Sequence, residues 1–164
     1  MHTHNDAWDP KLAQRAVTAR MAQATAPWLW LLLGLFCFRV MAQLAVIEGG
    51  PAWLPSFEYW HSGALPYGAL VASQLLLIVI MARTALVFSR GAVRPRRRFG
   101  QMLGALGLVY LVTMLVRLVL GLTLLPEHPW FGKALPAVFH LALAGFVLLV
   151  SRFHLRASHQ DSDA

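Results

Sequence analysis

The chain has 164 residues, of which 58% are hydrophobic and only 13% are charged, whereas a soluble globular domain carries about 25% charged residues. This composition argues against a water-soluble fold, and the apolar residues lie in long uncharged stretches typical of membrane-spanning helices. The net charge of +7 comes from basic residues that flank these stretches, which indicates membrane topology and not nucleic-acid binding.

Residues 9–22 precede the first apolar stretch, and we expect them to form a short amphipathic helix. Asp9 can cap this helix and Pro10 can occupy its first position. The helix is expected to lie in the membrane interface. The N-terminal region lacks the apolar core and small-residue cleavage site of a removable secretory signal.

Four apolar stretches are long enough to cross a hydrocarbon core of about 30 Å. Pro27 suits a helix start, Gly91 follows the second stretch, Pro126 closes the third, and Pro136 falls in the first turn of the fourth. The sequence therefore predicts an all-α integral membrane protein, a single domain folded as a four-transmembrane-helix bundle. The predicted spans are about 27–47, 66–88, 101–125 and 133–153.

The basic residues near the span ends predict the orientation. Between the spans lie a basic loop at 89–100 and two loops, 48–65 and 126–132, which carry almost no basic residues. By the positive-inside rule, both termini and loop 89–100 face the cytoplasm and the other two loops face outward. We expect the bacterial cytoplasmic (inner) membrane. The basic residues on the inner side are Lys11, Arg15, Arg20, Arg90, Arg94, Arg96, Arg97, Arg98, Arg152 and Arg156.

Four ionisable residues fall inside the spans, where an unpaired charge costs several kcal/mol. Arg83 is close enough to the cytoplasmic end of its span to reach the head groups. Arg39 and Arg117 both lie roughly 12 Å below the outer surface at 1.5 Å per residue. His140, in the fourth span, lies at a similar depth and is expected to be uncharged. We therefore expect Arg39, Arg117 and His140 to share one site.

Further polar residues lie at the same depth. Gln43 shares the face of Arg39, and Gln74 lies in the second span. In the third span, Tyr110, Thr113, Arg117 and Gly121 fall on one stripe. In the fourth span, Ala137, His140, Ala144 and Ser151 form a small-residue face suited to close helix packing. The predicted ligand-binding residues are Arg39, Gln43, Gln74, Tyr110, Arg117 and His140.

No span contains Asp or Glu, so a countercharge for the two arginines must come from elsewhere. Glu48, Glu58 and Glu127 in the outer loops are candidates, and so is an anionic ligand. We expect a non-catalytic membrane subunit whose outer-leaflet polar pocket binds an anionic amphiphile or a quinone-like ligand. Membrane lipids and a larger membrane complex are the expected partners. A purely structural role, with the polar groups pinning the helices together, stays open.

A redox subunit or enzyme is the alternative, with haem or a divalent metal bound through histidine. His140 is the one histidine within a span, and the loops pair Glu58 with His61 and Glu127 with His128. No nucleotide-binding, hydrolase or zinc-protease motif occurs, and the single cysteine, Cys37, permits no intrachain disulfide. The sequence therefore favours a protein without catalytic activity and without a cofactor.

Overall fold

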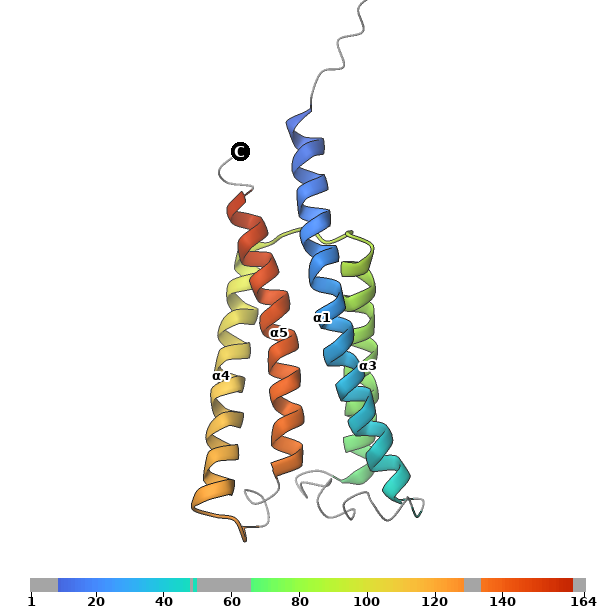
Figure 1. The fold of residues 1–164 in the computed structure, drawn as a ribbon, viewed down its shortest axis with the longest axis vertical. Helices are drawn as coiled ribbons and strands as arrows, with labels where there is room; N and C mark the ends of the chain where they lie inside the picture. The colour runs from blue at the N-terminus through green and yellow to red at the C-terminus, as the bar shows by residue number, and fades with distance from the viewer. Residues whose placement is uncertain (1–8, 48, 50–65, 129–133, 161–164) are drawn as a thin grey trace, which may run out of the picture.

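The computed structural model describes residues 9–47, 49, 66–128 and 134–160, which form four long helices (Figure 1). Each helix is long and apolar enough to cross a membrane. The prediction of an all-α protein with four candidate membrane spans is confirmed. The helices are α1 (Pro10–Ile47), α3 (Tyr67–Ser89), α4 (Arg97–Thr123) and α5 (Ala134–Gln160).

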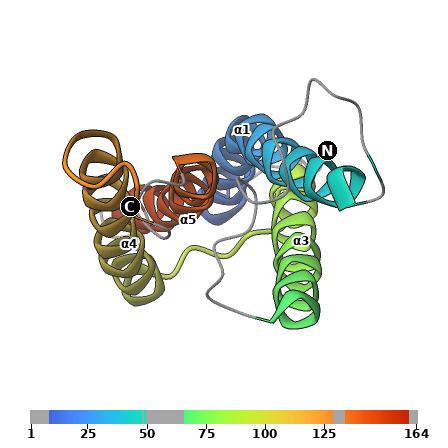
Figure 2. The same cartoon turned by 90° about the horizontal axis from the view of Figure 1, so that it is seen from below.

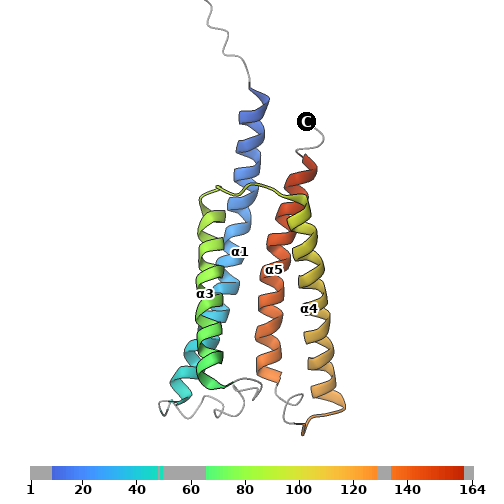
Figure 3. The same ribbon diagram turned by 180° about the vertical axis from the view of Figure 1, so that it is seen from behind.

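The helices stand side by side in the order α4, α5, α1, α3 and form an open arc (Figure 2). Helix α5 packs against α4 and α1, and α1 packs against α3. Among the described residues, the backbones of α3 and α4 are not in contact, and α5 lies between these two helices in Figure 3. The predicted bundle is therefore open along one side.

The start of α1, the end of α5 and the connection 90–96 between α3 and α4 all lie at the same end of the molecule (Figure 1). We call this the basic end, because Arg94, Arg96, Arg97 and Arg98 are exposed there. The basic residues predict that this end faces the cytoplasm.

Helix α1 is longer than the predicted first span. Residues 10–22, expected as a separate interfacial helix, are continuous with the span and project beyond the basic end of α3 (Figure 1). Residues 11–26 consist mainly of strong helix formers and contain no glycine. Pro27 therefore lies inside the helix, on its exposed side, and not at a helix start. The predicted cap does begin α1, because Asp9 accepts a hydrogen bond from the Lys11 N–H at 2.9 Å.

Helix α1 lies in the middle of the arc and packs against its neighbours through a stripe of buried residues. The residues of this stripe are separated alternately by four and three positions. This spacing is typical of helices that pack at small crossing angles. The stripe meets apolar residues of α3 and α5, and Phe88 contacts Phe153 edge to face with ring centroids 4.8 Å apart. The stripe comprises Ala22, Ala26, Leu29, Leu33, Phe36 and Val40.

Helix α4 buries small or polar residues and exposes large apolar ones. Gly100, Gly107, Arg117 and Gly121 are buried, whereas residues such as Val109 are exposed. Buried small residues and exposed apolar ones are what a lipid environment favours. Ser151, from the small-residue face predicted on α5, lies here, and its hydroxyl donates to the Gly100 carbonyl at 2.7 Å.

The connection from α3 to α4 begins with a glycine. Gly91 has a φ of +63°, and its N–H donates to the Phe88 carbonyl while that of Ala92 donates to the Val87 carbonyl. This is the Schellman pattern that ends helices. A Cβ on Gly91 would also lie 2.9 Å from the Ala19 Cβ. Helix α3 therefore ends at this turn, and the connection is packed against α1.

Candidate functional site

The six predicted ligand-binding residues come from all four helices, and we refer to them together as the polar cluster. Four of them lie six to eight residues from the helix ends that are opposite the basic end, or about 9–12 Å along the helix axes. Tyr110 lies two helical turns further than Arg117 from this end of α4, on the same stripe of the helix. The members are Arg39 and Gln43 of α1, Gln74 of α3, Tyr110 and Arg117 of α4, and His140 of α5.

Tyr110 and His140 join α4 to α5. The Tyr110 hydroxyl lies 2.6 Å from His140 Nδ1, and the two rings meet edge to face with centroids 5.9 Å apart. Either group can donate in this hydrogen bond, depending on the histidine tautomer. The pair can therefore offer either a hydrogen-bond donor or a hydrogen-bond acceptor in the interior of the arc.

Both arginines lie near this pair. Arg39 and Arg117 are 5% and 4% exposed, and each interacts electrostatically with both Tyr110 and His140. The Arg39 guanidinium carbon also lies 5.9 Å from the centroid of the Phe139 ring, within the range of a cation–π contact. The structure thus brings two guanidinium ions to one region, although α1 and α4 are not in backbone contact within the described residues.

Gln43 and Gln74 link α1 to α3. Gln74 Nε2 donates to Gln43 Oε1 at 3.3 Å, and the side chains are 1% and 3% exposed. Among the described residues, Gln43 Nε2 and Gln74 Oε1 have no hydrogen-bond partner. A buried amide group without a partner costs about 1–3 kcal/mol. The pair therefore leaves one amide nitrogen and one amide oxygen without a partner within the described residues.

One residue of the predicted stripe lies elsewhere. Thr113 is exposed, and its hydroxyl donates to the Val109 carbonyl of its own helix at 2.8 Å, so it does not extend the polar cluster. Arg83 is exposed as well, as expected for a side chain that reaches toward the head groups.

The alternative metal ligands do not form a site in the part of the chain that the structure describes. No group of three or more His, Cys, Asp or Glu residues occurs among residues 9–47, 49, 66–128 and 134–160. Glu127 and His128 are exposed, and Glu58 and His61 lie outside the described residues. The exposed Glu127 carboxylate does not serve as a buried countercharge for the arginines.

Two features of this region were not predicted from the sequence. Phe139 contacts Arg39, but an aromatic residue in an apolar helix carries no signal that separates a cation–π partner from a lipid-facing ring. The open side between α3 and α4 depends on which helix faces meet, and the hydrophobic pattern does not reveal this.

Comparisons of the chain with protein-family models, curated proteins and solved structures found no match.

Proposed function

We propose that the polar cluster binds the anionic head group of a membrane amphiphile, and that the protein is a non-catalytic binding or accessory subunit. One observation carries this proposal. Arg39 and Arg117 are both buried and both interact with the pair formed by Tyr110 and His140. Two positive charges therefore lie near the same pair of half-buried side chains.

A buried cation needs a countercharge, because leaving water costs it several kcal/mol. None of the four helices contains Asp or Glu, so no acid lies on the helices beside the arginines. Two guanidinium ions cannot neutralise each other. An anionic ligand bound near both arginines would be attracted by two positive charges at once.

The residue types narrow the class of ligand. Guanidinium groups bind carboxylates and phosphates with paired hydrogen bonds. Tyr110, His140 and the free amide groups of Gln43 and Gln74 add neutral donors and acceptors. A neutral quinone could use these neutral groups but would not exploit the positive charge of the two arginines. We therefore favour an amphiphile that carries a carboxylate or a phosphate.

Small molecules that co-purify with the protein would test the proposal. We expect negative-ion mass spectrometry of the detergent-purified wild type to show one acidic amphiphile, enriched over the bulk lipid. Arg39→Gln and Arg117→Gln should each lose it, because they remove charge and keep hydrogen-bonding groups. Arg152→Gln makes the same charge change at an exposed position and should retain it.

A second measurement separates binding from helix pinning. If the arginines serve a ligand, Arg117→Leu removes a desolvation cost. The unfolding temperature of this variant in detergent should then be at least as high as that of the wild type. Retention of the amphiphile by all three glutamine variants would overturn the proposal. An Arg117→Leu variant with an unfolding temperature far below that of the wild type would also overturn it. A Soret band or stoichiometric metal in the wild type would favour the redox alternative instead.

A further inference from the structure

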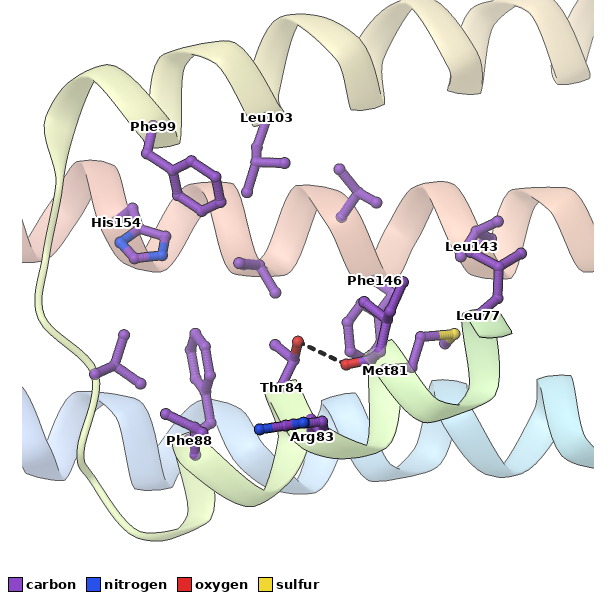
Figure 4. A pocket seen from close by; sticks show the side chains of 15 residues that line it. Leu77, Met81, Arg83, Thr84, Phe88, Phe99, Leu103, Leu143, Phe146 and His154 are labelled. Carbon is purple, nitrogen blue, oxygen red and sulfur yellow. Dashed lines mark hydrogen bonds between the residues drawn. The ribbon is translucent and has the colours of Figure 1, made fainter. Parts of the chain in front are cut away.

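An apolar groove of about 440 Å³ lies on the open side of the arc, between α3 and α4 (Figure 4). Side chains of α3 and α4 face each other across it, and α5 forms its floor. The wall from α3 includes Leu77, Met81 and Phe88, and the wall from α4 includes Phe99 and Leu103. Such a groove in a membrane-spanning segment is open to the hydrocarbon chains of the bilayer.

The length of the groove matches one leaflet. It extends from Leu77 to Phe88 along α3 and from Leu143 to His154 along α5. Eleven residues of helix span about 16 Å, which is roughly half of a hydrocarbon core of about 30 Å. The observed length therefore fits an acyl chain of a single leaflet.

The groove ends at a cluster of positive charge. A second cavity, of about 330 Å³, shares Phe99 and His154 with the groove and is also lined by Arg94 and Arg96. Both arginines are exposed, and the connection 90–96 contains no acid. The Arg96 backbone N–H donates to His154 Nδ1 at 3.3 Å, which ties the connection to α5 at the mouth of the groove.

We propose that this groove binds a phospholipid of the leaflet at the basic end. One acyl chain lies between α3 and α4, and the anionic head group lies against Arg94 and Arg96. The charge at the mouth selects the anionic lipid, because each arginine near an anionic surface adds affinity. The site is distinct from the polar cluster, because Gln74 and His140 lie about one helical turn beyond the far end of the groove.

Native mass spectrometry of the detergent-purified chain tests this proposal, with phosphatidylglycerol and phosphatidylcholine of identical acyl chains as probes. We expect the wild type to prefer phosphatidylglycerol. The double variant Arg94→Gln/Arg96→Gln should lose a preference on the order of 30-fold, if each arginine contributes as much as at an anionic membrane surface. Arg152→Gln makes the same charge change at an exposed position that lines neither cavity, and it should retain the preference.

A second pair of variants tests whether the acyl chain occupies the groove. Thr84 faces the groove, so Thr84→Trp should fill it and weaken the binding of both lipids. Val79 lies on α3 outside the groove and is exposed, so Val79→Trp should bind as the wild type does. Unfolding temperatures of all variants would show that they fold.

Three results would overturn the proposal. The first is equal binding of the two lipids by the wild type. The second is a Thr84→Trp variant that binds lipid as tightly as the wild type. The third is a dimer of the wild type that Thr84→Trp converts to a monomer, because this would show that a second copy of the chain fills the groove.

Discussion

Glycine packing between α4 and α5 gives a prediction whose size follows from the structure. A Cβ built on Gly100 would lie 2.9 Å from the His154 Cβ and 3.2 Å from two atoms of Leu155. The His154 Cβ is fixed to the backbone of α5, so Gly100→Ala forces the two helices apart. Separation would also lengthen the 2.7 Å hydrogen bond from Ser151 to the Gly100 carbonyl.

The expected loss in the free energy of unfolding combines two effects. Overpacking of this kind lowers the free energy of unfolding by about 1–3 kcal/mol. Replacing glycine by alanine in a helix raises it by about 0.5–1 kcal/mol. We therefore expect Gly100→Ala to lower the free energy of unfolding by about 1–2 kcal/mol. Reversible unfolding in mixed detergent micelles, followed by circular dichroism, would measure this change.

Two matched glycines provide a graded control. A Cβ on Gly107 would meet the flexible end of Leu148 at 3.0 Å, so Gly107→Ala should cost less than Gly100→Ala. A Cβ on Gly34 would have no neighbour within 4 Å, so Gly34→Ala should be neutral or stabilising by up to about 1 kcal/mol. The reasoning fails if Gly100→Ala is as stable as Gly34→Ala, because α4 and α5 would then not be in close contact.

Two further predictions concern orientation and His140. A single cysteine at Ser56, in a Cys37→Ser background, should react with impermeant reagents from the outer side, and labelling from the cytoplasmic side alone would reverse the predicted topology. His140→Gln keeps a neutral hydrogen-bonding group and should retain more of the co-purified amphiphile than His140→Ala. Equal and complete loss in both variants, together with loss of a chromophore or metal, would instead identify His140 as a cofactor ligand.

Helix ends were predictable where a residue has a specific backbone role. Gly91 supplies the positive φ that ends α3, and Pro136 lies in the first turn of α5, where its missing N–H costs little. The start of the first span was not predictable in the same way. Pro27 lies within α1, because the residues on both sides favour helix and the ring lies on the exposed side.

The polar cluster was predictable because an ionisable or amide side chain stands out in an apolar helix, and its depth can be counted from the helix ends. The extent of the polar stripe on α4 was not. Thr113 shares the stripe of Arg117, but a threonine hydroxyl can bond to its own helix and then needs no partner inside the protein. The sequence therefore overestimates the polar face of α4 at Thr113.

The order of the helices was not predictable, because in a membrane both lipid and neighbouring helices accept apolar side chains. The face that α4 presents to α5 is marked by glycines and not by leucines. Helix α3 has no comparable mark toward α4, and the backbones of these two described helices are not in contact. The groove between them is a property of the assembled arc and not of any single helix.

The glutamine pair gives a test that separates stability from binding. Gln74→Met removes one partner and leaves Gln43 with an unpaired carbonyl and amide in the interior, so it should lower the free energy of unfolding by about 1–3 kcal/mol. Gln43→Met/Gln74→Met removes both amides at similar volume and should recover most of that loss. If the amides also contact the amphiphile, the double variant folds normally yet retains less of it. A double variant no more stable than Gln74→Met would show that the amides do not act as a pair.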